Sequence, residues 1–178
     1  MAFLLPAGGN SSAPLSVDSV ITILRDMDTV RRLGKRKTIA LVAHDHKKRD
    51  LIDWAEYNKA ALARHDLVAT GTTGKLLEDQ LDRPVKKLLS GPLGGDQQIG
   101  SMIAEGKVDI LIFFWDPMEA QPHDPDIRAL LRVAVTWNIP IACDRATADF
   151  IFTSPLMHDD YTAHMPDYSE YVQRPFGK

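Results

Sequence analysis

The segment Thr38-Ile39-Ala40-Leu41-Val42-Ala43 indicates the class of fold, because it is a continuous apolar run bounded by polar residues. Such a run is typical of a strand that is buried on both faces of a parallel sheet. The run from Val108 to Trp115 has the same character and is the strongest strand signal in the chain. Patterns of helical period separate these runs, so the sequence predicts βαβ units with right-handed crossovers.

The rest of the chain shows the same alternation of apolar runs and helical patterns. It predicts a three-layer α/β domain, in which helices flank a mainly parallel central sheet of about five strands. The expected strands are residues 38–43, 67–70, 84–89, 108–115 and 139–143. Apolar residues at helical spacing between these runs predict the helices of the outer layers. We assign residues 36–178 to this single domain.

Residues 1–35 are predicted to be an N-terminal extension. Residues 1–16 are rich in Gly, Ser, Asn and Pro, which is typical of a flexible tail. Apolar residues from Val17 to Val30 recur near helical spacing, and Gly34 is a suitable helix end. The extension is therefore expected to hold a flexible tail followed by a helix.

The composition is that of an ordinary globular protein, with 44% hydrophobic and 25% charged residues among 178. A net charge of -3 gives no global basic field, which argues against nucleic acid or an acidic membrane as a partner. No apolar run reaches transmembrane length, and the N-terminus lacks the features of a secretory signal. The single cysteine, Cys143, excludes an internal disulfide and fits a reducing compartment. We expect a soluble cytoplasmic protein.

Polar and glycine residues follow several of the predicted strands at the point where each strand ends. Because ligands of parallel α/β folds bind beyond the carboxyl ends of the strands, these segments are expected to meet at one site. The segments are His44 to Lys48, Thr70 to Gly74, Ser90-Gly91 and Asp116.

The loop Ser90-Gly91-Pro92-Leu93-Gly94-Gly95-Asp96 leads into a helical pattern that starts near Ile99. Glycines in such a loop let a ligand approach the backbone, and a helix N-terminus favours a compact anion. Asp96 is unusual in a pure phosphate cradle. It either caps the helix or presents its acidic side chain to a bound ligand.

Two further segments offer groups for a phosphate ester. The loop from Thr70 to Lys75 is not a P-loop, because two residues rather than four separate Gly71 from Gly74, but its hydroxyls and N–H groups suit a phosphate monoester. Thr72 or Thr73 can alternatively cap the helix. Lys48 is either a cation for the phosphate dianion or a solvated surface lysine.

Two histidine motifs complete the candidate site. His44-Asp45-His46 has an alternating spacing that some metal sites use, but further ligands are not evident, so no metal is predicted. In His123-Asp124-Pro125-Asp126, Asp124 suits the N-cap of a helix and Pro125 its first position. His123 is then available to face the site, and the helix N-terminus favours its neutral form.

These motifs resemble one family, methylglyoxal synthase. The matching segments are ALVAHDHKK (40–48), ATGTTG (69–74), LSGPLGGDQQIG (89–100), ILIFFWDP (110–117), PHDPDIRALLR (122–132) and WNIPIACDRATADF (137–150). They lie in the order and at the spacing of the family across most of residues 38–154. The resemblance implies a Rossmann-like domain and a cofactor-free lyase that converts dihydroxyacetone phosphate to methylglyoxal and inorganic phosphate. It also implies a homohexamer that inorganic phosphate often inhibits.

The resemblance assigns roles to residues that match the family's motifs. Asp96 would be the catalytic base, with His44 and His123 stabilising the enediolate oxygens. The substrate contacts would be His44, Lys48, Thr70, Gly71, Thr72, Thr73, Ser90, Gly91 and His123. Asp45, Asp116 and Asp126 would be supporting carboxylates. The family's arginine near the C-terminus has no clear match, because Arg174 is near but not in register.

Two other functions stay open at this point. A domain of similar fold is the effector-binding part of carbamoyl phosphate synthetase, which would need the phosphate loop but not Asp96 with His123. A metal-dependent phosphoesterase using His44-Asp45-His46 would lose its activity with a chelator, whereas the lyase would not.

Overall fold

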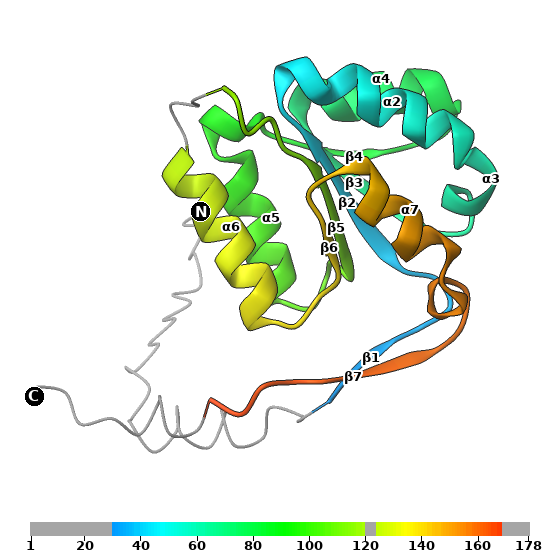
Figure 1. The fold of residues 1–178 in the computed structure, drawn as a ribbon, viewed down its shortest axis with the longest axis vertical. Helices are drawn as coiled ribbons and strands as arrows, with labels where there is room; N and C mark the ends of the chain where they lie inside the picture. Colours follow the sequence, from blue (N-terminus) through cyan, green and yellow to red (C-terminus); the bar gives the residue numbers. More distant parts are fainter. Residues whose placement is uncertain (1–29, 120–123, 169–178) are drawn as a thin grey trace, which may run out of the picture. The chain divides into compact units, whose positions relative to one another are not determined.

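The computed structural model describes residues 30–119 and 124–168, of which residues 30–166 belong to one compact unit. Figure 1 shows a central sheet with helices on both faces. The strands are β1 (Val30–Leu33), β2 (Thr38–Ala43), β3 (Asp66–Thr70), β4 (Lys86–Leu88), β5 (Ile110–Phe114), β6 (Ile141–Ala142) and β7 (Tyr161–His164). The helices are η1 (Asp45–Lys47), α2 (Lys48–Tyr57), α3 (Lys59–Leu62), α4 (Gly71–Leu81), η2 (Gly91–Leu93), α5 (Gly95–Ala104), α6 (Asp124–Thr136), α7 (Arg145–Thr153) and η3 (Pro155–Met157).

The central sheet has five strands in the order β4-β3-β2-β5-β6, and every pair in it is parallel. Strand β2 lies at its centre, with Ala40 opposite both Val68 of β3 and Leu111 of β5. The chain order reverses direction across β2, so the strands on either side of it open a crevice at their carboxyl ends. The predicted α/β class with a five-stranded parallel sheet is confirmed.

Side chains of β2 alternate between two hydrophobic cores, as a strand of period two requires. Ile39 and Leu41 pack in the core beneath α2, α4 and α7, which includes Trp54. Ala40 and Val42 pack in the core beneath α5 and α6. Because both faces are covered, the strand reads as a continuous apolar run rather than an alternating one.

The predicted strands 38–43 and 67–70 agree closely with β2 and β3, while the other three are shorter than expected. Strand β5 covers 110–114 of the predicted 108–115, and β6 covers 141–142 of the predicted 139–143. Helix α6 starts at Asp124, so Pro125 is its second residue rather than its first. Strand ends differ because backbone pairing, not apolar composition, sets them.

The prediction of a helix that ends near Gly34 is wrong for residues 30–33. Residues 30–33 form strand β1, which pairs antiparallel with β7 in a separate two-stranded sheet. Arg31 anchors β1 by donating hydrogen bonds to the Asp109 carboxylate at 3.0 Å and to the Val108 carbonyl. These partners lie far away in the sequence, so local periodicity could not reveal them. The rest of that predicted helix, residues 17–29, lies outside the described residues.

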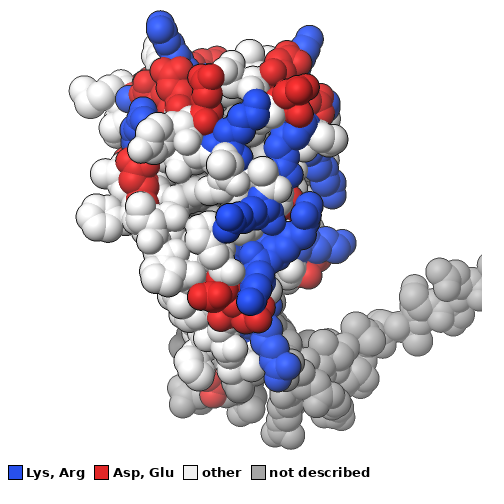
Figure 2. All heavy atoms as spheres, turned by 90° about the vertical axis from the view of Figure 1, so that its right-hand side faces the viewer, with Lys and Arg blue, Asp and Glu red and all other residues white. Residues whose placement is uncertain are grey.

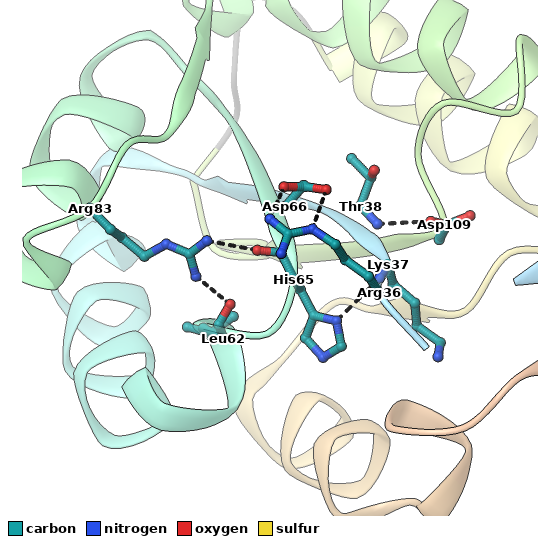
Figure 3. Close-up of polar contacts among 8 residues, drawn as sticks. All are labelled: Arg36, Lys37, Thr38, Leu62, His65, Asp66, Arg83 and Asp109. Atoms are coloured by element: carbon teal, nitrogen blue, oxygen red, sulfur yellow. Dashed lines mark hydrogen bonds and ion pairs between the residues drawn. The ribbon is translucent and has the colours of Figure 1, made fainter. Parts of the chain in front are cut away.

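A polar network occupies the amino ends of the parallel strands (Figure 3). His65, which is fully buried, accepts a hydrogen bond at Nδ1 from the backbone N–H of Lys37 at 3.2 Å. The Asp109 carboxylate accepts a hydrogen bond from the Thr38 N–H at 2.8 Å, and Arg83 donates to the His65 carbonyl at 2.7 Å. This network joins β2, β3 and β5 at the end of the sheet opposite the crevice.

The surface carries charges of both signs. Figure 2 shows Lys and Arg side chains running in a band down one face, with Asp and Glu side chains gathered beside it. Arg36 pairs with Asp66 at 2.5 Å, and Lys87 pairs with Glu78. Within the part of the chain that the structure describes, no helix is long and apolar enough to cross a membrane.

Candidate active site

A cavity of about 270 Å³ lies at the carboxyl ends of β2 and β3. Its walls come from the segments after β2, β3 and β4 and from the first turn of α5. The lining residues are Val42, Ala43, His44, Asp45, Lys48, Thr70, Thr72, Thr73, Ser90, Gly91, Pro92, Asp96 and Phe113. The structure thus brings together nine of the predicted site residues from three separate loops.

Asp96 lies in the first turn of α5 and lines this cavity although only 3% of its surface is exposed. The interpretation of Asp96 as the helix N-cap is wrong, because α5 starts at Gly95 and Gly94 precedes it with a φ of 101°. That left-handed conformation favours glycine and turns the chain sharply into the helix. The turn leaves a carboxylate buried at the wall of a polar cavity.

Two glycines allow the segments around Ser90 to pack closely. A Cβ on Gly95 would lie 2.1 Å from the Leu89 carbonyl oxygen, and one on Gly71 would lie 3.1 Å from the Ser90 nitrogen. The Gly71 N–H donates a hydrogen bond to the Leu89 carbonyl at 3.2 Å, and the Gly95 N–H donates to the Ser90 carbonyl at 2.9 Å. These glycines allow Ser90 to pack between the starts of α4 and α5. Gly71, which was predicted to contact the substrate, is not part of the cavity lining.

Lys48 supplies a cation at the cavity. Its ammonium donates to the Asp45 carboxylate at 2.5 Å and to the Thr72 hydroxyl at 3.2 Å. The hydrogen bond from Lys48 holds the pKa of Asp45 below its usual range. Lys48 therefore joins the loop after β2 to the start of α4, where hydroxyl and N–H groups are also presented. Neither Thr72 nor Thr73 is the N-cap of α4; that position belongs to Thr70, which makes no side-chain cap.

His44 is buried, lines the cavity and packs edge-on against Phe113 with ring centroids 5.1 Å apart. Its Nδ1 accepts a hydrogen bond from the Asp116 N–H at 3.1 Å. His46 lies outside the lining with 71% of its side chain exposed. The two histidines therefore do not line the same cavity.

Among the described residues, the His44-Asp45-His46 triplet does not form a metal-binding group. His46 instead approaches Asp116 and Glu119, and one ligand atom from each of the three lies within 4.8 Å of the others. The group lies partly at the surface, where His46 pairs with the two carboxylates. These contacts become ion pairs when the His46 imidazole is protonated.

Four predicted site residues fall outside the lining or the described residues, namely Gly71, Asp116, Asp126 and His123. Asp116 is buried and contacts His44 through its backbone, whereas Asp126 is half-buried in the first turn of α6. His123 and Arg174 lie outside the described residues. The site residues that the sequence did not single out are Val42, Ala43, Pro92 and Phe113. They are apolar ends of buried strands or loop residues, and nothing in their type marks a site.

Cys143 is half-buried at the end of β6, and burial raises the pKa of its thiol. A thiol held in its neutral form is a poor nucleophile. Cys143 is therefore better suited to packing as a small hydrophobic residue than to acting as a nucleophile.

Comparison with known proteins points to the same class of protein as the fold and the cavity do. Residues 50–143 match the sequence model of the family described as the MGS-like domain. Methylglyoxal synthase of Sodalis glossinidius (strain morsitans) is 57% identical over 144 residues, covering 81% of this chain and 94% of the relative. Methylglyoxal synthase of Pectobacterium atrosepticum is 55% identical over 145 residues, covering 82% and 95%.

A solved structure gives the same result. The crystal structure of methylglyoxal synthase from Elizabethkingia anophelis NUHP1 is similar with a TM-score of 0.79 and 59% sequence identity, covering 84% of this chain and 98% of that one. An α/β domain with this sheet order and this cavity is thus an MGS-like domain. The chain belongs to the methylglyoxal synthase family.

Proposed function

We propose that this protein is a carbon–oxygen lyase that converts dihydroxyacetone phosphate to methylglyoxal and inorganic phosphate. The observation that carries the proposal is the placement of Asp96, a carboxylate 3% exposed, in the wall of a polar cavity beside a lysine and two hydroxyl-bearing loops. A phosphate cradle alone has no use for a buried carboxylate, whereas an enolising enzyme needs a base.

The phosphate group is bound, in this proposal, between Lys48, the Thr70–Thr73 segment and the Ser90-Gly91 segment, all of which meet at the cavity. The N–H groups at the start of α4 favour an anion, and the ammonium of Lys48 already reaches Thr72 there. Phosphate leaves as the dianion, so donors that stabilise the departing charge matter more than an acid.

Asp96 removes a proton from the hydroxymethyl carbon, and the electrons form an enediolate whose oxygens accept hydrogen bonds from His44 and His123. The bond between the phosphate-bearing carbon and its phosphate oxygen then breaks with the electron pair leaving on phosphate, and the departing oxygen takes up the proton that Asp96 removed, so that phosphate is released as the dianion. The resulting enol tautomerises to methylglyoxal. Proton removal and charge stabilisation are both supplied by side chains, so the proposed reaction needs no cofactor.

The proposal includes the cytoplasmic location and the homohexamer expected from the sequence. Exposed apolar side chains such as Phe150, 80% exposed, and Val135, 67% exposed, are available for contacts between copies of the chain. Light scattering coupled to size-exclusion chromatography measures the assembly directly, and a monomeric mass would contradict the hexamer without affecting the reaction.

The decisive experiment follows methylglyoxal and free phosphate released from dihydroxyacetone phosphate with a chelator present. Equal release of both products is expected. For Asp96→Asn we expect turnover to fall about 1,000-fold or more, because only positioning and electrostatics remain when the base is removed. A matched circular dichroism spectrum for the variant controls for folding.

Other outcomes identify the competing functions. Phosphate release without methylglyoxal would indicate a phosphoesterase, and loss of activity with chelator would make it metal-dependent. Binding of the substrate without turnover in the parent protein would indicate an effector-binding module. Substantial activity of the Asp96→Asn variant would contradict the role of Asp96 as base.

A further inference from the structure

Two loops that leave neighbouring strands meet beside the cavity. The loop after β2 carries His44 and His46, and the loop after β5 carries Asp116 and Glu119. The strands β2 and β5 are paired, with Ala43 opposite Phe114, so their loops start side by side. Each histidine contacts the second loop, one on the cavity side and the other near the surface.

The contact on the cavity side fixes the tautomer of His44. Its Nδ1 accepts a hydrogen bond from the Asp116 backbone N–H at 3.1 Å in a buried setting. A nitrogen that accepts a hydrogen bond carries no proton, so the neutral ring bears its proton on Nε2. Protonating Nδ1 would set two donors against each other. His44 is thus arranged to donate from Nε2.

The contacts near the surface hold the backbone that makes this hydrogen bond. The Asp116 carboxylate accepts a hydrogen bond from the Met118 N–H at 3.0 Å and lies 3.5 Å from Nδ1 of His46. The Glu119 carboxylate lies 3.3 Å from the same nitrogen. We call His46, Asp116 and Glu119 the clasp. Because its members come from both loops, the clasp limits how far the Asp116 N–H can move from His44.

We propose that His46 and Glu119 are positioning residues, which hold the Asp116 N–H against His44 and so keep His44 as an Nε2–H donor toward the substrate. The inference rests on the proposed function for what the donor acts on. In that reaction a neutral donor can stabilise an enediolate oxygen, whereas the opposite tautomer would present a lone pair to it and repel it. The clasp therefore favours one of two chemically opposite states of the same ring.

The size of the effect follows from the exposure of the clasp. His46 is 71% exposed at its side chain and Glu119 40%, whereas Asp116 is 11% exposed. When the His46 imidazole is protonated, ion pairs at such exposure contribute up to about 1 kcal/mol, or about fivefold in a rate or an equilibrium. Breaking the clasp does not remove the Asp116 N–H, but it lets this group move away from His44 part of the time. The tautomer should therefore become mixed rather than invert.

The test uses the full chain labelled with ¹⁵N at its six histidines, whose ring nitrogen shifts report the tautomer. The His44 signals are identified by their loss in His44→Gln. We expect the parent to show His44 as the Nε2–H form. In Glu119→Gln and His46→Gln the signals should move toward a mixture, with kcat about fivefold lower and KM within twofold of the parent.

Glu105→Gln is the matched control, because it removes a carboxylate that pairs with Lys107 at the surface, in a pair of 2.5 Å that has no member in the cavity lining. It should leave both the His44 signals and kcat unchanged. Glu119→Asp, which restores the charge, should recover part of the loss. A merely structural role for the clasp would lower the melting temperature without moving the His44 signals.

Three outcomes would overturn the inference. The first is a parent His44 in the Nδ1–H form, and the second is unchanged His44 signals and kcat in both clasp variants. The third is a change in the His44 signals on adding chelator, which would mean that a cation rather than the ion pairs joins the loops. Failure of the proposed function is recognised separately, because the parent would then release no methylglyoxal while the tautomer signals still report on the clasp.

Discussion

The two ends of the central sheet each bury a histidine whose Nδ1 accepts a hydrogen bond from a backbone N–H. At the carboxyl end, His44 accepts from Asp116 at 3.1 Å and borders the cavity. At the amino end, His65 accepts from Lys37 at 3.2 Å, is 0% exposed and does not line that cavity. The local pairing is the same, and the two histidines differ in that His44 lines the cavity and His65 does not.

Each end also has a lysine, with a similar contrast. Lys37 is 3% exposed and donates to the backbone carbonyls of Gly34, Met157 and Asp159 at 3.0 to 3.1 Å. Lys48 contacts one carboxylate and one hydroxyl beside the cavity. Groups that have all their partners inside the protein stabilise the fold, whereas groups that border a cavity keep capacity for a ligand. Residue type alone does not separate the two cases.

The largest expected difference is in activity between the two histidines. His44→Leu should lower turnover about 100-fold or more, as removal of one preorganised donor does in other enzymes. His65→Leu should leave turnover per folded molecule within twofold, because His65 lies at the opposite end of the sheet. Initial rates of methylglyoxal formation, normalised to the folded fraction, measure both. A comparable loss in the two variants would remove the functional contrast between the ends.

A second contrast concerns the lysines and is measured by denaturant unfolding. Lys37→Met should lower the free energy of unfolding by about 3 to 5 kcal/mol, because three carbonyls lose a charged donor at a buried position. Lys48→Met should change it by less than about 0.5 kcal/mol, since Lys48 pairs with the exposed Asp45, but should raise KM about tenfold. Equal unfolding midpoints in the two variants would argue against this assignment.

The pH dependence of stability should report His65. Burial, and after it the charge of nearby Lys37, lower the pKa of His65 from 6.5 to about 4. Between these two values the unfolded chain binds the proton and the folded protein does not, so stability falls as the pH falls from 6.5 toward 4. The loss amounts to about 3 kcal/mol.

Urea unfolding of the parent and of His65→Leu at several pH values isolates this contribution. The difference in free energy of unfolding between the two proteins should change by about 3 kcal/mol between pH 7 and pH 4. A constant difference across that range would show that His65 does not titrate as its burial implies.

The smallest expected effect compares two glycines in α5. Gly95→Ala should destabilise the protein by about 2 kcal/mol and lower activity, because the new Cβ would meet the Leu89 carbonyl and push Ser90 away. Gly100→Ala should be neutral or stabilise by up to about 1 kcal/mol, because its Cβ has room and alanine favours a helix. Thermal unfolding ranks the two, and the reverse order would contradict the close packing at Ser90.

Much of the fold and of the cavity could be predicted from the sequence. Continuous apolar runs such as 38–43 indicate strands buried on both faces, and the rule that parallel strands place their carboxyl ends together gathers His44, Thr70 and Ser90 at one site. These predictions succeed because burial on both faces and loop composition are local properties of the chain. The motifs that carry the family resemblance are likewise contiguous segments.

Other features were decided by tertiary structure alone. Strand β1 was expected to be helical, because its pairing with β7 and the hydrogen bond from Arg31 to Asp109 involve residues more than 70 positions away. The sequence left open whether Asp96 caps the helix. The structure shows that Gly94, with its positive φ, is the N-cap and that Asp96 lies in the wall of the cavity. The tautomer of His44 depends on the Asp116 N–H, which no pattern in the sequence reveals. Sequence patterns report which residues are buried, whereas the partners of buried polar groups are set only when distant segments pack together.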